Sequence, residues 1–192
     1  MSTDTFRNYI NGEWVTATRS LTNISPANTA DILGEYAQAD TEQVAQALVA
    51  AHAGQALWQE SGLEQRYQVL MAIGDELIAR KAELGEQLAR EEGKTLAEGM
   101  GEVYRSGQFF HYYAAEVLRQ MGETADSVRP GVEIETRREP VGVVAIITPW
   151  NFPMATAAWK IAPALAFGNA VVFKPANAVP ASAWSLTEII AR

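Results

Sequence analysis

Two short apolar segments with a helical segment between them constrain the fold of this chain more than any other feature. Val141 to Ile147 is an uninterrupted apolar run, and Ala170 to Phe173 is a second, shorter run. Such runs are typical of strands that are buried on both faces of a parallel sheet. Residues 155–167 between them and 181–192 after them favour helix. The order strand, helix, strand, helix with short links predicts an α/β fold with parallel strands.

A helix-rich region precedes these strands. Three helical segments are expected there, at about residues 41–59, 61–93 and 95–121. Two of them open with the spacing of a capping box, in which a hydroxyl side chain and a glutamate three residues later satisfy early backbone N–H groups. The two pairs are Ser61 with Glu64 and Thr95 with Glu98. Gly93 is expected to end the second segment.

Three further segments favour β structure. Tyr9 to Val15 contains Asn11-Gly12, a dipeptide that readily forms the type I′ turn of a hairpin. Residues 32–36 follow a turn and predict a short strand. Val132 to Arg138 alternates apolar and charged residues, which indicates a half-exposed strand.

Charge and composition exclude several classes of function. The 192 residues include 15 Lys and Arg against 23 Asp and Glu, a net charge of −8, which argues against binding to nucleic acid. The longest apolar run is far too short to span a membrane. With no cysteine and two histidines, the sequence predicts no metal site. A cytoplasmic location is expected because Met1 to Asn11 has no features of a secretory signal.

Polar side chains occur near the ends of the apolar runs. Asn151 is bracketed by Pro149 and Pro153, which restrict its backbone, and its amide could stabilise a developing oxyanion. Lys174 directly follows the second run and could bind ribose hydroxyls or a phosphate. Lys160, on the helix between them, could relay a proton or position a group. Taken singly, each has a simpler interpretation, as a turn asparagine, a solvated loop lysine and a surface lysine.

Several motifs occur in a fixed order around these residues. They are Glu-Glu-Gly-Lys at 91–94, Arg-Arg-Glu-Pro-Val-Gly-Val at 137–143, Pro-Trp-Asn-Phe-Pro at 149–153, Trp-Lys-x-x-Pro-Ala-Leu-Ala-x-Gly-Asn at 159–169 and Lys-Pro-Ala at 174–176. As a set they resemble the N-terminal part of the aldehyde dehydrogenase superfamily. Within it, the run from Lys174 to Trp184 looks most like the 2,5-dioxopentanoate (α-ketoglutarate semialdehyde) dehydrogenases.

The resemblance implies a division of the chain. Residues 1–122 would form the N-terminal part of a cofactor-binding domain, residues 123–141 an extended β arm through which subunits pair, and residues 142–192 a Rossmann-like βαβα segment. A homo-oligomer is implied for the complete protein. Because no turn or cap follows Ile190, we expect the chain to be the front portion of a longer protein.

The resemblance also implies a mechanism, in which a cysteine thiolate attacks an aldehyde, hydride passes to the nicotinamide and a glutamate activates water. Asn151 matches the side chain that holds the oxyanion, and Lys160 is a further catalytic candidate. The cofactor contacts match Ile147, Thr148, Pro149, Trp150 and Asn151 on one strand end, and Lys174, Pro175, Ala176 and Asn177 on the next. The walls of the substrate tunnel match Phe152 and Trp159.

Three positions depart from the family pattern. The chain has no nucleophile cysteine, so by itself it is expected not to oxidise aldehydes. Asn177 stands where NAD-preferring members often have a glutamate, and a neutral amide would not repel the 2′-phosphate of NADP, so either NAD or NADP is expected. Trp159 stands where several succinic semialdehyde dehydrogenases have an arginine, which disfavours their mode of carboxylate binding.

The sequence therefore predicts NAD(P)-dependent oxidation of a small aldehyde, such as 2,5-dioxopentanoate, to the carboxylic acid. The alternative is a non-catalytic short product that binds nucleotide or pairs with a full-length relative. A helical interaction module built on residues 40–121 is a third hypothesis, which the specificity of residues 140–176 disfavours.

Overall fold

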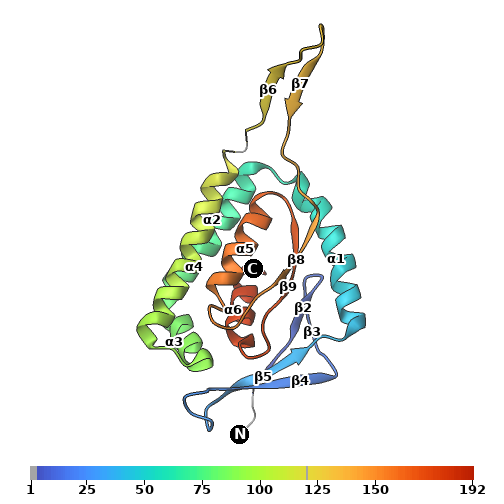
Figure 1. Ribbon diagram of the computed structural model, residues 1–192. Helices are drawn as coiled ribbons and strands as arrows, with labels where there is room; N and C mark the ends of the chain where they lie inside the picture. The colour runs from blue at the N-terminus through green and yellow to red at the C-terminus, as the bar shows by residue number, and fades with distance from the viewer. Residues whose placement is uncertain (1–3, 120) are drawn as a thin grey trace.

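The computed structural model describes residues 4–119 and 121–192 and has the predicted α/β architecture (Figure 1). The strands within these residues are β1 (Thr5–Phe6), β2 (Asn8–Ile10), β3 (Glu13–Val15), β4 (Arg19–Ile24), β5 (Ile32–Gln38), β6 (Glu123–Asp126), β7 (Glu133–Thr136), β8 (Val143–Ile147) and β9 (Ala170–Lys174). The helices are α1 (Thr41–Glu60), α2 (Leu63–Ala79), α3 (Lys81–Glu92), α4 (Leu96–Val117), α5 (Ala155–Ala166) and α6 (Pro180–Ile190).

The strand–helix–strand unit predicted from the two apolar runs is present. β8 and β9 pair in parallel, with Val143 opposite Ala170 and Ile147 opposite Lys174, and α5 connects them. Asn169 helps to fix where the second strand starts. Its side-chain amide donates to the carbonyl of Ala164 at the end of α5, and its Oδ1 accepts from the backbone N–H of Gly142 just before β8. The two strands are therefore tied in register at their N-terminal ends.

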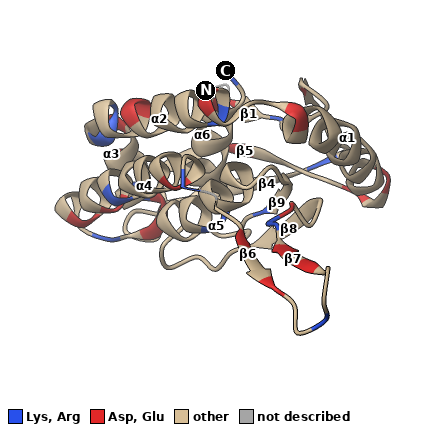
Figure 2. Cartoon of the chain, turned by 90° about the horizontal axis from the view of Figure 1, so that it is seen from above, with Lys and Arg blue, Asp and Glu red and all other residues tan. Residues whose placement is uncertain are grey.

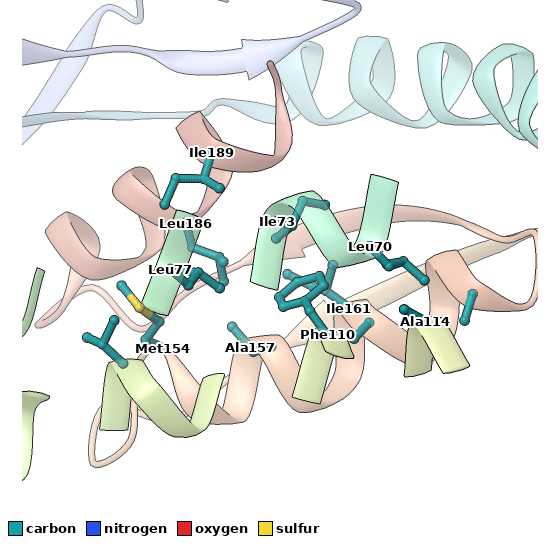
Figure 3. Packing of buried hydrophobic residues seen from close by; sticks show 14 of the residues in the cluster. Leu70, Ile73, Leu77, Phe110, Ala114, Met154, Ala157, Ile161, Leu186 and Ile189 are labelled. Atoms are coloured by element: carbon teal, nitrogen blue, oxygen red, sulfur yellow. The ribbon is translucent and has the colours of Figure 1, made fainter. Parts of the chain in front are cut away.

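A layer of helices covers one side of this pair. Figure 1 shows α2 and α4 side by side, α5 and α6 packed against them, and α1 on the far side of β8 and β9. Buried side chains of α2 to α6, together with Ile146 of β8, form the core, and Figure 3 shows Leu77, Leu186 and Met154 gathered near Ile73 and Phe110. None of the helices in the described ranges is long and apolar enough to cross a membrane.

The prediction that residues 141–147 are buried on both faces is wrong for this chain. Ile146 is 2% exposed and points into the helical core, whereas Ile147 is 71% exposed and Ala145 is also exposed. Alternate residues of a strand point to opposite faces. One face of β8 therefore packs on the core, while the described residues leave much of the other face open.

Local signals located several helix and turn boundaries correctly. The Thr95–Glu98 capping box is present, and Gly93 ends α3 in the left-handed conformation with a φ of 88°. In the first hairpin Asn11 and Gly12 both have positive φ, as a type I′ turn requires. β5 confirms the strand expected at residues 32–36.

Other boundaries differ from the prediction. Gly62, not Ser61, is the N-cap of α2, because the Ser61 hydroxyl donates to the carbonyl of Trp58 and accepts from Nε of Arg66. The expected single helix over residues 61–93 divides at Arg80, whose guanidinium binds Glu76, Glu83 and Glu188. α4 ends at Val117 rather than near residue 121, and position 120 within that expected helix lies outside the described residues.

A β hairpin stands away from the helical body. β6 and β7 pair antiparallel, with Glu123 opposite Thr136, and all residues of both strands are exposed. The strand expected at residues 132–138 is thus shorter and fully exposed rather than half-exposed, because nothing in the described part of the chain packs on it. Figure 2 shows the acidic residues along this hairpin, which are Glu123, Asp126, Glu133 and Glu135.

Glycines allow α4 to approach its neighbours closely. A Cβ at Gly99 would overlap the backbone carbonyl of Gly85 on α3, whereas a Cβ at Gly101, also on α4, would meet nothing within 4 Å. Because backbone cannot move aside cheaply, we expect Gly99→Ala to lower the free energy of unfolding by about 1–3 kcal/mol. Gly101→Ala is the matched control and should be neutral or stabilising by up to about 1 kcal/mol. Urea denaturation measures both, and equal stability of the two variants would contradict the packing argument.

Candidate active site

The two parallel strands end at the same edge, and most of the predicted site residues follow them there. Ile147 lies opposite Lys174, and the backbone N–H of Thr148 donates to the carbonyl of Lys174 at 3.3 Å. In open α/β sheets, ligands bind beyond the carboxyl ends of the strands. The structure therefore brings the two predicted cofactor segments, 147–151 and 174–177, together at one edge.

The second of these segments forms a short polar turn. Nζ of Lys174 donates to Oδ1 of Asn177 at 3.3 Å, and both side chains are exposed. Pro175 and Ala176 between them are half-buried, and the N–H of Val179 closes the turn on the carbonyl of Ala176. An ammonium and a neutral amide are thus presented side by side. This pair can donate to ribose hydroxyls or to a phosphate without placing a carboxylate nearby.

The first segment combines exposed aromatic side chains with a buried anchor. Trp150 is 59% exposed, and Asn151 and Phe152 are exposed as well, whereas Pro153 and Met154 are fully buried. The hydroxyl of Thr148 is buried and makes no hydrogen bond to any described residue. Asn151 accepts a hydrogen bond at its backbone carbonyl from Nζ of Lys94 at 3.3 Å, and the residue is exposed.

A buried ion pair lies behind this segment. Nζ of Lys94 is 2.6 Å from Oε2 of Glu102 and 2.6 Å from Oε2 of Glu92. Burial lowers the pKa of Lys94, but the hydrogen bond to Glu102 and the nearby carboxylate of Glu92 outweigh burial, and the net pKa is raised. Burial in turn raises the pKa of Glu92. The ammonium of Lys94 therefore stays charged and counterbalances the carboxylate of Glu102, which is only 5% exposed.

Two buried carboxylates cap the helices that follow the strands. Oε1 of Glu102 accepts from the backbone N–H groups of Met154 and Ala155 at 3.0 Å each, at the start of α5. Glu91 accepts from the N–H groups of Ala181 and Ser182 at the start of α6. A helix N-terminus attracts anions. Because carboxylates of the chain occupy both N-termini, a cofactor phosphate would have to be bound by other groups.

The sequence analysis gave no role to Lys94, Glu91 or Glu102, although the helical spacing of the two glutamates indicates that they are buried. Glu91 follows Leu84 and Leu88 at the spacing of one helix face, so it falls on the buried side of α3. Glu102 likewise follows Gly99 by three residues on the buried face of α4. A carboxylate in the apolar register of a helix is rarely fully buried without partners. Such positions therefore predict capping or ion pairing.

The remaining candidates lie on α5 or over its start. Trp159 is exposed and its ring stacks on Phe109 of α4, with 5.7 Å between centroids. The Phe152 ring lies 4.6 Å from Nζ of Lys94. Lys160 is exposed. In the part of the chain that the structure describes, it makes no contact with Asn151. The structure therefore groups Asn151 and Phe152 around Lys94 but does not bring Lys160 to the oxyanion candidate.

Comparison with known proteins identifies the family. The model of the aldehyde dehydrogenase family matches residues 14–192. The chain belongs to this family. It is 43% identical over 182 residues to the α-ketoglutarate semialdehyde dehydrogenase of Haloferax volcanii, which covers 93% of the chain and 37% of that protein. It is 39% identical over 176 residues to the corresponding enzyme of Bacillus subtilis, covering 91% of the chain and 36% of the relative.

Solved structures of the aldehyde dehydrogenase family agree with the fold. The chain superposes with a TM-score of 0.93 and 34% identity on the NADP-dependent glyceraldehyde-3-phosphate dehydrogenase of Bacillus halodurans in complex with NADP, covering 98% of the chain and 41% of that structure. An NADP-dependent enzyme from E. coli gives 0.93 and 33% identity over 96% and 39%. The chain thus spans less than half the length of these relatives, and the resemblance predicted from residues 91–176 is confirmed.

Proposed function

We propose that this chain forms the front part of the cofactor-binding portion of an NAD(P)-dependent aldehyde dehydrogenase. The observation that carries the proposal is the shared edge of β8 and β9, where Asn151 and the Lys174–Asn177 pair follow neighbouring parallel strands. Family membership and the named semialdehyde dehydrogenases among the relatives support it. We propose a semialdehyde of the 2,5-dioxopentanoate type as the substrate.

Each group at this edge has a role in the proposal. The exposed amide of Asn151 donates to the oxyanion that forms when the aldehyde is attacked. Lys174 and Asn177 bind the adenosine ribose of the cofactor, and the backbone of residues 147–150 lines its path. Phe152 and Trp159 form apolar walls for the aldehyde. The cofactor supplies hydride acceptance when it is bound. The 192 residues contain no cysteine, so this chain provides binding and oxyanion stabilisation but no thiolate nucleophile.

The proposed cofactor site has a direct binding test. We expect Lys174→Ala to weaken NADP⁺ binding roughly 10- to 100-fold, because it removes a charge-assisted hydrogen bond of about 1.5–3 kcal/mol. Lys81→Ala, which removes another lysine of the chain from α3, is the matched control and should leave binding unchanged. Isothermal titration calorimetry measures both affinities. Equal affinity of the Lys174→Ala variant and the parent would remove the basis for this site.

Asn177 determines the cofactor preference in this proposal. Asn177→Glu places a carboxylate beside Lys174 and should reduce the affinity for NADP⁺ more than that for NAD⁺, by roughly 10-fold, through repulsion of the 2′-phosphate. The solved relatives in complex with NADP or described as NADP-dependent are consistent with NADP use. An unchanged ratio of the two affinities would contradict the assignment.

A second candidate function rests on the exposed β6–β7 hairpin. The chain could act without catalysis, by pairing through residues 123–141 with a copy of itself or with a longer relative. Both edges of the exposed β6–β7 hairpin are open to such pairing. Light scattering after size-exclusion chromatography tests it. A monomer that binds neither NAD⁺ nor NADP⁺ would contradict this candidate.

A further inference from the structure

Lys94 lies at the centre of a contact network that the proposed chemistry does not use. It follows Gly93, whose left-handed backbone ends α3 and turns the chain toward α4. From there the ammonium reaches Oε2 of Glu102 at 2.6 Å, the carbonyl of Asn151 at 3.3 Å and the face of the Phe152 ring at 4.6 Å. One charge therefore contacts both the core of the helical layer and the loop that carries the oxyanion candidate.

Glu102 extends this network to the other end of the same loop. Its Oε2 binds Lys94, and its Oε1 accepts from the backbone N–H groups of Met154 and Ala155. The loop between β8 and α5 is thus held at Asn151 by the ammonium and at the start of α5 by the carboxylate. Both charges are largely removed from water, where such contacts are stronger than at the surface.

We propose that the Lys94–Glu102 ion pair is the positioning device for Asn151. It fixes the backbone of residues 151–155 and thereby the direction of the Asn151 amide, without touching substrate or cofactor. This inference rests on the proposed function in one respect, namely that the Asn151 amide stabilises the oxyanion. The positioning itself is a property of the chain and can be measured without activity.

Variants of the pair separate positioning from simple stability. Lys94→Met alone leaves the buried Glu102 carboxylate unpaired and risks a failure to fold. The double variant Lys94→Met with Glu102→Gln is made in a Glu92→Gln background and compared with Glu92→Gln alone, because Glu92 also lies 2.6 Å from Lys94. It removes every charge of this cluster, while the glutamine carbonyl that replaces the Glu102 carboxylate can still accept from the N–H groups that begin α5. Lys94→Arg keeps the charge. The matched control is Arg90→Met with Asp31→Asn, which neutralises an ion pair of 2.6 Å that has no contact with residues 150–155.

The first readout is the NMR signal of the Asn151 side-chain amide in the isotope-labelled 192-residue chain. We expect the neutral double variant to fold but to shift or broaden this signal and to speed hydrogen exchange at the N–H of Ala155. The Lys94→Arg variant should restore the parent signal in large part, and the Arg90–Asp31 control should leave it unchanged. An unshifted Asn151 signal in the neutral double variant would overturn the proposal, whatever the activity.

The second readout is kinetic, in a protein of the relatives' length that carries these residues. We expect the neutral double variant to lower kcat roughly 10- to 100-fold with little change in the KM for the cofactor, as displacement of a positioned group by about 1 Å can cost about 100-fold. If Asn151→Ala lowers kcat but the double variant does not, the positioning proposal is overturned. If the Asn151 signal shifts and neither variant lowers kcat, positioning stands and the oxyanion role of Asn151 fails instead.

Discussion

Replacement of Asn151 by alanine is expected to lower kcat by about 10²–10³ in a protein of the relatives' length that carries this chain, because one donor to the oxyanion is lost. The structure gives this residue a backbone carbonyl bound to Lys94 and a side chain that is exposed beyond the end of β8. The amide is therefore free to donate to a bound group. Since it makes its contribution as charge develops, the loss should appear in kcat rather than in the affinity for substrate.

Cofactor affinity distinguishes this role from a general disturbance of the site. Lys174 ends β9 and Asn177 lies on the loop after it, and the pair contacts no part of the Asn151 side chain among the described residues. Asn151→Ala should therefore lower kcat far more than it weakens NADP⁺ binding. Asn151→Asp is the sharper variant, because a carboxylate of the same shape cannot donate when ionised and repels an oxyanion, so its kcat should be lower still. Parent-like kcat in both variants would exclude the oxyanion role.

Local features of this fold could be predicted from sequence because they depend on residues close together in the chain. The Asn11-Gly12 turn, the Thr95–Glu98 capping box and the left-handed Gly93 each require only the residues beside them. Ser61 fits the same capping pattern but is bound instead by Arg66 and Trp58. A partner from the following helix thus overrides a local preference.

Pairings between distant segments could not be predicted in the same way. β4 and β5 pair antiparallel, and β1 adds to β5 in parallel, but strands this short and polar carry little periodicity of their own. The N-terminal strands are instead fixed by an aromatic cluster in which Phe6 stacks on Tyr36 and contacts Trp184 of α6. Contacts of this kind depend on the position of α6 in the fold, which no local sequence pattern near Phe6 predicts.

The candidate site shows the same division. Asn151 and Lys174 could be placed from sequence because each follows an apolar run, and the parallel pairing of β8 and β9 then brings them to one edge. The groups that support them could not be placed in this way, because they lie far away in the sequence. Glu91 is on α3, Glu102 is on α4 and Lys94 is in the turn between these helices. Their charges are explained only by the helix N-termini and the loop that they meet in three dimensions.

The second large effect is expected at Glu91, the carboxylate that begins α6. It is 2% exposed and accepts hydrogen bonds from Asn23, Ala181 and Ser182, including the Ser182 hydroxyl at 2.6 Å. Burial raises the pKa of this carboxyl, and the bonds from Ser182 and Ala181 oppose the rise. Glu91→Ala would leave several buried donors without an acceptor, each costing about 1–3 kcal/mol. We therefore expect a loss of about 3 kcal/mol or more in the free energy of unfolding.

Graded substitutions show whether capping accounts for this loss. Glu91→Gln keeps one acceptor oxygen but turns its NH₂ group toward the donors. Its free energy of unfolding should therefore lie between those of the parent and the alanine variant. Glu86→Ala, on the exposed side of the same helix, should change stability by no more than about 0.5 kcal/mol.

Urea denaturation gives the free energies, and hydrogen exchange at the N–H groups of Ala181 and Ser182 reports on the cap. If Glu91→Ala and Glu86→Ala were equally stable, or if exchange at these groups were unchanged, Glu91 would not act as the cap that stabilises the N-terminus of α6. If they differ as expected, α3 fixes the helix that follows the cofactor loop, and the stability of α6 is set by a residue ninety positions earlier in the chain.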